Sequence, residues 1–594
     1  MKLADYVIDF LASQGIKHNF LISGGAVIHL VDSTSKHPQM EYICGQHEEH
    51  SAAAADMYAR VTRNLGVVMT TSGPGATNIV TSVSNAYFDS IPMLCITGQV
   101  SRFRIKKSKK LRQKGFQETD VVSIFQSITK YAKLVLNPEE IRYELEKAIY
   151  LAKEGRPGPS LLDIPDDLQR VDIDPSKLVG FIPPQKKKKS PLLNVQKLFQ
   201  MIGQSKRPVL IFGAGIQCAN SAKEALAFAE HFQIPVVCTW GGADVIPHAH
   251  PLNMGCIGVC GPRGGNFALQ TADLVIALGT RLSPMVTGGK QNLFAPSAKK
   301  VMVDIDPEEL TKFTPETFVI DLPIQADLND FFATTQSLYS EQIDSYADWR
   351  SLIRNWIARY PICPSGFEGT EGKIQPHLFV KKISSLAKEG DIIIGDTGAN
   401  LSWTLQAFET KQDQRIFSAW NHTPMGYSLP ASIGATLASN RDVVCLIGDG
   451  GFMMCLQELA TIRRHNLPIR IFLFNNAGHA IQKQTIDTWL NSNYAAVDEP
   501  SGLYFPDYRK IAEAFNIPFY ELKTNKDLDY LPEVWAQKGP FLCDVQVIET
   551  QKIVPMLKFG SGIEDLDPKI SKTELETILL ECQNLSNKSE PAHR

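Results

Sequence analysis

Short apolar runs of the length of buried strands alternate with stretches of helical periodicity along most of the chain. The clearest strand-like runs lie at residues 65–70, 93–97, 209–212, 274–278, 392–394 and 443–447. Strands that alternate with helices in this way are typical of parallel sheets covered by helices. We therefore predict an α/β protein.

Two segments rich in proline, glycine or charge divide the pattern into three parts. The first linker runs from Pro183 to Pro191 and contains four consecutive lysines, and the second covers residues 361–376. A chain of 594 residues needs several domains. We predict three doubly wound parallel-sheet domains at residues 1–180, 191–355 and 374–560. A C-terminal tail at residues 561–594 follows, which we expect to be disordered from Asn584.

Composition narrows the class of protein. Hydrophobic residues make up 44% and charged residues 21%, and the net charge of −3 argues against a general nucleic-acid partner. The 11 cysteines lack paired spacing apart from Cys256 and Cys260, which favours a reducing cytoplasm. The first eleven residues predict an amphipathic helix rather than a signal peptide. No apolar run approaches 18 residues, so we expect no membrane association.

A Gly-Asp-Gly turn centred on Asp449 is followed 27 residues later by Asn476. A strand at 443–447, a helix at 456–464 and a strand at 469–474 are predicted around them. Both polar residues then lie at carboxyl ends of parallel strands, where open α/β sheets bind ligands. A carboxylate and an amide oxygen suit Mg²⁺ bound to a diphosphate, and glycines allow close approach of the backbone. The alternative is an ordinary strand–helix turn.

The complete pattern resembles the signature of thiamine-diphosphate enzymes, and further segments resemble the acetolactate synthase branch of that family. The matching segments are residues 24–26, 47–48, 71–78, 96–100, 116–120, 156–159, 396–400 and 424–430. The resemblance covers roughly residues 1–560. It implies a pyrimidine-binding, a central and a diphosphate-binding domain, in that order.

The family resemblance assigns the pyrimidine side of the coenzyme to the first domain. Glu48 is implied to protonate the aminopyrimidine ring and stabilise its imino tautomer, as a buried glutamate with raised proton affinity can. Gln46 replaces the arginine of the family segment. The structural alternative for Glu48 is an acid in the first turn of a helix. The other residues implied here are Gly25, Phe116 and Gln117 beside the reacting carbons, and Ser72, Pro74, Asn78 and Gln99 around the ring.

The resemblance assigns the diphosphate side to the last domain. Met425 is implied to lie beneath the coenzyme and bend it, an orientation effect, although a core methionine would look the same. Gly478 is implied to join Asp449 and Asn476 as a Mg²⁺ ligand. The other implied contacts are Thr397, Gly398, Ala399, Asn400, Gly450, Gly451 and His479. Family members build this site from two subunits, which implies a homodimer or homotetramer and leaves a regulatory subunit open.

The middle domain resembles the FAD-contacting segment of acetolactate synthases less completely. Arg281, Thr287 and Gly288 match, whereas residues 283–285 read Ser-Pro-Met where the family carries two aspartates and an arginine. Asp306 belongs to a second family-like segment. The resemblance thus implies FAD in a non-redox role at these four residues, with three positions departing from it.

Two further departures concern the acceptor. The family's Met-Val-x-Gln-Trp run, whose Trp helps to choose the acceptor ketoacid, reads Ile-Gln-Lys-Gln-Thr at 481–485. Residues 102–114 carry eight basic residues and no acid, directly before Phe116 and Gln117, and exceed the family's loop in length. Such a patch attracts a doubly charged diphosphate. A solvated loop is the alternative.

The leading hypothesis is a cytoplasmic carboligase that decarboxylates pyruvate and transfers its two-carbon unit to a carbonyl. With a second pyruvate as acceptor the product is 2-acetolactate, a step of branched-chain amino acid biosynthesis. The alternatives are transfer to a nucleotide-linked keto-sugar, a pyruvate oxidase or decarboxylase activity, and a non-catalytic subunit that retains the coenzyme. The Phe116–Gln117 pair weighs against the oxidase, and Glu48, Asp449 and Asn476 weigh against the non-catalytic subunit.

Overall fold

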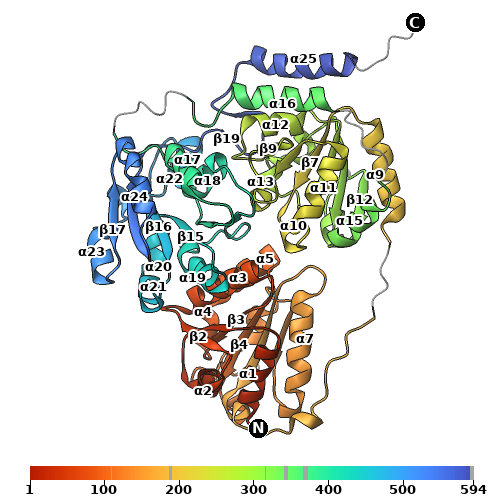
Figure 1. The fold of residues 1–594 in the computed structure, drawn as a ribbon. Helices are drawn as coiled ribbons and strands as arrows, with labels where there is room; N and C mark the ends of the chain where they lie inside the picture. The colour runs from red at the N-terminus through yellow and green to blue at the C-terminus, as the bar shows by residue number, and fades with distance from the viewer. Residues whose placement is uncertain (109, 186–189, 315, 340–345, 365–371, 589–594) are drawn as a thin grey trace.

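The computed structural model describes residues 1–108, 110–185, 190–314, 316–339, 346–364 and 372–588. Three lobes follow one another along the chain, and each contains a six-stranded parallel sheet with helices packed against it (Figure 1). The prediction of an α/β fold with three parallel sheets is confirmed. Parts of both expected linkers, residues 186–189 and 365–371, lie outside the described residues.

The first lobe orders its strands β2-β1-β3-β4-β6-β5. Its strands are β1 (His18–Leu21), β2 (Glu41–Cys44), β3 (Gly66–Thr70), β4 (Met93–Gln99), β5 (Tyr131–Leu134) and β6 (Pro159–Pro165). Its helices are α1 (Leu3–Ser13), α2 (Ile28–Lys36), α3 (Glu48–Thr62), α4 (Pro74–Asn78), α5 (Val80–Asp89), α6 (Val121–Phe125), α7 (Ile141–Lys153) and α8 (Asp166–Gln169). Every residue of β3, β4 and β6 is buried, as expected where helices cover both faces of a parallel sheet.

The middle lobe has a different order, β9-β8-β7-β10-β11-β12, which is that of dinucleotide-binding sheets. Its strands are β7 (Pro208–Phe212), β8 (Val236–Cys238), β9 (Asn253–Cys256), β10 (Leu274–Leu278), β11 (Lys299–Asp304) and β12 (Leu322–Gln325). Its helices are α9 (Leu192–Gln204), α10 (Ala214–Cys218), α11 (Ala222–Phe232), α12 (Arg263–Gln270), α13 (Pro284–Thr287), α14 (Pro307–Thr311), α15 (Leu328–Gln336) and α16 (Ala347–Arg359).

The third lobe repeats the order of the first, as β14-β13-β15-β16-β18-β17. Its strands are β13 (Ile392–Gly395), β14 (Arg415–Phe417), β15 (Val443–Gly448), β16 (Ile469–Asn475), β17 (Phe519–Leu522) and β18 (Phe541–Gln546). Its helices are α17 (Pro376–Leu386), α18 (Ala399–Ala407), α19 (Ser428–Ala438), α20 (Asp449–Cys455), α21 (Leu459–His465), α22 (Ala480–Trp489), α23 (Tyr508–Ala514) and α24 (Leu531–Trp535). None of the helices within the described ranges is long and apolar enough to cross a membrane.

The first and third lobes meet where α3 packs against α19. A Cβ atom on Gly434 would lie 2.0 Å from the carbonyl oxygen of Ala54, so only glycine allows the two backbones to approach this closely. A buried ionic cluster fixes the same contact. Arg60 on α3 binds Asp56 and Asp89, and Asp89 also accepts the backbone N–H of Trp420 from the third lobe.

The C-terminal segment returns to the middle lobe. The short antiparallel pair β19 (Met556–Leu557) and β20 (Leu566–Asp567) leads to α25 (Lys572–Lys588), which lies along α16 (Figure 1). The indole N–H of Trp356 donates to Glu581 over 2.7 Å. The expectation of disorder from Asn584 is therefore wrong as far as Lys588, because the segment becomes helical when it packs on another lobe.

Candidate active site

Two helices begin directly at the ends of neighbouring strands in the third lobe. The strand order reverses between β13 and β15, and α18 and α20 start just beyond these strands. Helix N-termini at such a switch point form an anion site. The helix expected from residue 456 in fact begins at Asp449, with a 3₁₀ turn at Leu456–Glu458 before α21. The sequence analysis predicted only a turn at residues 448–450, and glycine, a poor helix former, gives no signal for a helix that begins there.

Asp449 is the most constrained carboxylate of this switch point. It is 2% exposed, and its Oδ2 accepts the backbone N–H groups of Asn476 and Gly478 over 3.0 and 3.1 Å. Burial raises the pKa of Asp449 to about 7, against the lowering effect of its backbone donors. The pairing of β15 with β16 therefore brings together the residues predicted to hold Mg²⁺.

The side chain of Asn476 fits a ligand better than a structural role. It is 5% exposed, and its amide nitrogen has no hydrogen-bond partner among the described residues. Because the amide oxygen and nitrogen are assigned from their hydrogen bonds, one end of this buried amide is unsatisfied beside a carboxylate. An Asp carboxylate and an Asn amide supply the oxygen ligands that Mg²⁺ prefers.

Glycines line the floor between these helices. A Cβ atom on Gly450 would lie 2.6 Å from Nε2 of His479 and 3.0 Å from Cε of Met425. A Cβ atom on Gly451 would lie 2.2 Å from Oδ2 of Asp396. Met425, His479 and Gly450 thus converge, and a larger residue at position 450 would have to displace the side chain of His479 or Met425.

The turn after β13 carries the remaining predicted contacts of the diphosphate side. Gly398 has φ +83° before α18, a conformation that favours glycine. Asn400 donates from its side chain to the carbonyl of Thr397 over 2.6 Å, and its own Oδ1 is buried without a partner among the described residues. Ala399 is buried in the first turn of α18. Asp396 holds the Met425 loop by accepting the Gly426 N–H over 3.0 Å.

On the pyrimidine side, Glu48 begins α3. Its Oε2 accepts from the side chain of Asn78 over 2.8 Å, and its Oε1 would lie 3.6 Å from a Cβ on Gly75. Ser72 is buried and Pro74 is the first residue of α4. Glu48 is partly exposed in the single chain, whereas the sequence argument expected it to be buried.

The residues expected beside the reacting carbons lie around the same turn. Gln117 has φ +60°, uncommon for a residue other than glycine, and its carbonyl lies 3.0 Å from a Cβ built on Gly73. Phe116 is 84% exposed, and Gly25 lies in a 3₁₀ turn after β1. The Gln99 amide bonds Asp163 and the carbonyl of Thr119, so it fixes the segment that follows Gln117.

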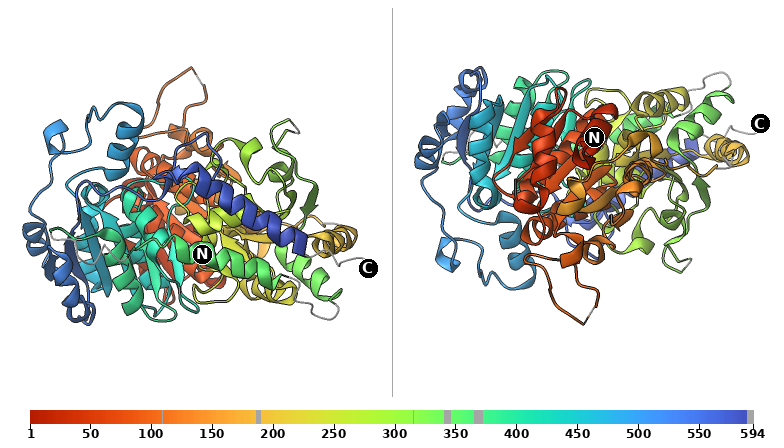
Figure 2. Two further views of the ribbon diagram at one scale, coloured as in Figure 1. Left: turned by 90° about the horizontal axis from the view of Figure 1, so that it is seen from above. Right: turned by 90° about the horizontal axis from the view of Figure 1, so that it is seen from below.

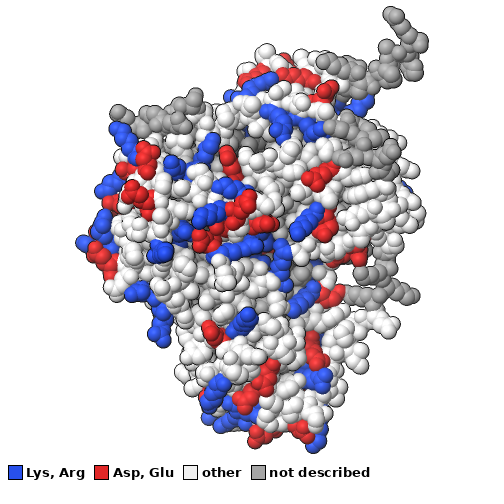
Figure 3. Space-filling view, viewed as in Figure 1, with Lys and Arg blue, Asp and Glu red and all other residues white. Residues whose placement is uncertain are grey.

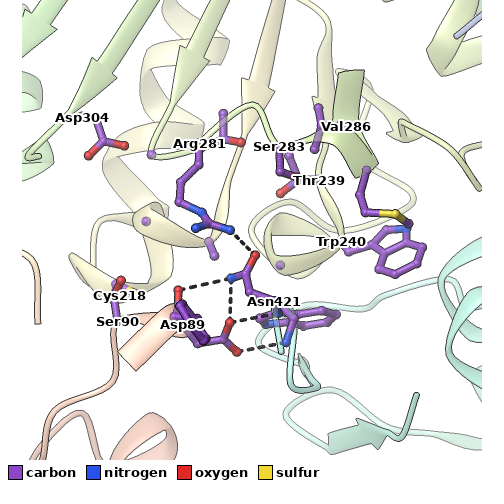
Figure 4. Close-up of a pocket in the computed structure, with 18 of the residues that line it drawn as sticks. Asp89, Ser90, Cys218, Thr239, Trp240, Arg281, Ser283, Val286, Asp304 and Asn421 are labelled. Atoms are coloured by element: carbon purple, nitrogen blue, oxygen red, sulfur yellow. Dashed lines mark hydrogen bonds between the residues drawn. The ribbon is translucent and has the colours of Figure 1, made fainter. Parts of the chain in front are cut away.

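A cavity of about 810 Å³ lies beside the switch point between β7 and β10 of the middle lobe. Arg281 enters it after β10, and Asn421 joins Arg281 to Asp89 by hydrogen bonds (Figure 4). The cavity wall also includes Thr397 and Gly398 of the third lobe. It therefore borders all three lobes and ends at the turn after β13.

Three residues predicted for FAD do not line this cavity. Thr287 donates to the Ser283 carbonyl within α13, and Gly288 packs on Leu557. Asp306 accepts from Arg156 over 3.0 Å. Sequence reasoning missed lining residues such as Cys218, Trp240 and Asn421. The position of Trp240 just after β8 was the available signal, because ligands bind beyond the carboxyl ends of strands.

Known families match each lobe. The N-terminal TPP-binding domain of thiamine pyrophosphate enzymes matches residues 1–124, the central domain residues 195–335, and the C-terminal TPP-binding domain residues 396–545.

Similar proteins extend over nearly the whole chain. Acetolactate synthase 1, chloroplastic, of Zea mays is 34% identical, covering 95% of this chain and 88% of its own. The probable acetolactate synthase large subunit of Methanocaldococcus jannaschii is 33% identical over 97% and 98%. The acetolactate synthase isozyme 1 large subunit of Escherichia coli is 33% identical over 94% and 96%. The chain therefore belongs to the acetolactate synthase family of thiamine pyrophosphate enzymes.

Proposed function

We propose that the protein condenses two pyruvate molecules to 2-acetolactate with release of CO₂, using thiamine diphosphate and Mg²⁺. The observation that carries this proposal is the buried cluster of Asp449 and Asn476 at the switch point of the third lobe. Relatives named acetolactate synthase at about a third identity support the choice of reaction.

The described residues divide the work between binding and proton transfer. Asp449, Asn476 and Gly478 would hold Mg²⁺ and, with the N-termini of α18 and α20, the diphosphate. Met425 and His479 border the same floor and would orient the coenzyme. When bound, thiamine diphosphate supplies the carbanion chemistry. Glu48 would hold the proton exchanged with the pyrimidine ring, positioned by the Asn78 amide.

We further propose that the active unit is a homodimer or a homotetramer, in which Glu48 of one copy faces the diphosphate site of another. In the single chain Glu48 is partly exposed and Phe116 is 84% exposed, so another copy of the chain can cover this side. The relatives from Methanocaldococcus jannaschii and Escherichia coli are named large subunits, which supports a regulatory partner. We assign the enzyme to the cytoplasm.

The middle cavity is proposed to hold FAD in a non-redox role. Its volume suits a large organic ligand, the sheet has the order of dinucleotide-binding folds, and Arg281 offers a cation for a diphosphate. These features fit the group although residues 283–285 depart from the family pattern.

The test is to incubate the purified protein with pyruvate, Mg²⁺ and thiamine diphosphate and to identify the products. We expect 2-acetolactate and CO₂ in equal amounts. If pyruvate is consumed but no acetolactate forms, pyruvate is not the acceptor. If no pyruvate is consumed, the proposed donor reaction is wrong as well. Release of a yellow flavin on denaturation tests the middle cavity separately.

A further inference from the structure

Residues 102–108 and 110–114, here called the basic loop, follow β4 and end at the pyrimidine turn. Its described residues belong to an orange segment that projects from the body of the molecule (Figure 2). Gln117, three residues beyond it, packs on Gly73. A Cβ atom on Gly75 of the same turn would lie 3.6 Å from Oε1 of Glu48. The end of the basic loop is thus fixed beside the predicted reacting centre.

The base of this loop is a defined structure. The buried carboxylate of Glu118 accepts the backbone N–H groups of Lys106 and Lys114 over 2.7 and 2.6 Å. Lys114 in turn donates from Nζ to the carbonyl of Phe103 over 2.6 Å. Although burial raises the pKa of Glu118, these backbone donors hold it below its usual range. The Glu118 carboxylate is therefore occupied by backbone N–H groups at the base of the loop.

Four of the loop's described cations have no acidic partner. Within the described residues, Arg102 pairs with Asp167, whereas Arg104, Lys107, Lys110 and Arg112 form no ion pair. On the face shown in Figure 3, by contrast, Lys and Arg are interspersed with Asp and Glu. Like charges gathered on one short, anchored loop repel each other, and a multiply charged anion would relieve that repulsion.

We propose that, besides pyruvate, the enzyme uses a sugar-like carbonyl acceptor whose phosphate or diphosphate binds to the basic loop and whose carbonyl reacts beside Gln117. This inference rests on the donor half of the proposed function, the decarboxylation of pyruvate. The new C–C bond forms between the two-carbon unit and the acceptor's carbonyl carbon, CO₂ leaves pyruvate, and the carbonyl oxygen takes a proton. The phosphate ester stays intact and serves only for recognition.

The reach of the loop indicates the kind of acceptor. Arg112 lies five residues before Gln117, a span of at most roughly 17 Å of extended chain. A phosphate several bonds from the reacting carbonyl, as in a sugar phosphate or a nucleoside-diphosphate sugar, matches such a span.

The experiment compares Lys107→Gln/Lys110→Gln/Arg112→Gln with a control of equal charge change, Lys223→Gln/Lys299→Gln/Lys538→Gln. All three control lysines are exposed and lie in other lobes. Acceptors are offered in matched pairs with pyruvate as donor. The pairs are glyceraldehyde 3-phosphate with glyceraldehyde, and a nucleoside-diphosphate-linked ketohexose with the free ketohexose.

We expect the wild-type protein to prefer one phosphorylated acceptor at least tenfold in kcat/KM. For that acceptor, kcat/KM of the loop variant should fall at least tenfold through a higher KM. Its pyruvate consumption and its kinetics with the free sugar should stay within twofold of the wild-type values. The control should keep the preference, and 0.5 M salt should weaken it because exposed charges are screened. The better of the two pairs tells a monoester from a diphosphate.

Equal use of both acceptors by the wild-type protein, or an equal loss for both in the loop variant, would overturn the inference. The inference would also be wrong if the loop variant lost binding to transfer RNA or to phosphatidylglycerol vesicles while its KM for the acceptor stayed unchanged. The loop would then bind a macromolecule or a membrane. If the wild-type protein consumes pyruvate but shows no preference for phosphorylated acceptors, only this inference is wrong. If the wild-type protein consumes no pyruvate, the proposed function is wrong.

Discussion

The first and third lobes share one strand order yet present different site chemistry. In the third lobe, Asp449 is buried and bound by three backbone N–H groups where its helix begins. In the first lobe, Glu48 follows β2, has one amide partner and is partly exposed. The topology places a site at each switch point, whereas the residues of the turns decide what each site does. The third lobe's carboxylate is buried within a single chain, whereas the first lobe's carboxylate is partly exposed there.

We expect the largest effect on coenzyme binding from removing the one carboxylate charge of Asp449 at the third lobe's switch point. Asp449→Asn keeps an oxygen that accepts the backbone N–H groups but removes the charge that attracts Mg²⁺. We expect Mg²⁺-dependent retention of thiamine diphosphate to be lost, measured by calorimetric titration. Glu389→Gln, an exposed site in the same lobe, serves as control. A variant that still retains the coenzyme would show that this carboxylate is not the metal ligand.

Glu48→Gln tests the first lobe's side of the comparison. Turnover should fall at least ~10²-fold, the scale for a lost acid–base partner, while the coenzyme is still bound. Glu49→Gln, the next residue of the same helical turn, should stay near the wild-type rate. Steady-state rates with pyruvate check both. Equal rates for the two variants would remove Glu48 from the mechanism.

The contact between the two lobes should be sensitive to a single methyl group. Gly434→Ala places a Cβ atom against the Ala54 carbonyl and should lower the free energy of unfolding by about 1–3 kcal/mol. Gly203→Ala in α9 meets nothing within 4 Å and should be neutral or stabilising by at most about 1 kcal/mol. Urea unfolding of both variants gives the comparison. Similar results for the two would mean that α3 and α19 are not in close contact.

The smallest expected effect is a pH dependence inside the first lobe. Burial raises the pKa of Asp163 to about 7, despite hydrogen bonds from Thr97 and Gln99 that lower it. A raised pKa means that the native state holds a proton the unfolded chain has released. This contribution to stability is complete below the unfolded pKa of about 3.8 and is lost as pH rises toward 7.

The Asp163→Asn variant cannot titrate at this position. Between pH 6 and 8 the free energy of unfolding of the wild-type protein should fall by about 1.4 kcal/mol more than that of the variant. This is the value of roughly one pKa unit, because pH 6 lies about one unit below the folded pKa. Urea midpoints at the two pH values measure the difference, in which the other titrating groups cancel. An identical pH dependence in both proteins would contradict a protonated Asp163.

Sequence alone predicted the features that local pattern controls. Runs such as Leu274–Leu278 are wholly apolar because both faces of the strand are covered, and the structure confirms that strand. The spacing of Asp449 and Asn476 follows from one strand–helix–strand unit. Features that depend on distant contacts were not predictable. Asn421 reaches the middle cavity only through the packing of three lobes, and α25 is helical against α16.

The packing of the C-terminal segment on the middle lobe affects the order of folding during synthesis. The backbone N–H of Leu557 donates to Val259, the Asn266 amide donates to Ile563, and Glu581 binds Trp356. The ribosome releases these partners only after the third lobe has been made. The middle lobe therefore reaches its final form last, although it is translated second, and premature termination near residue 550 would leave its apolar face open to aggregation.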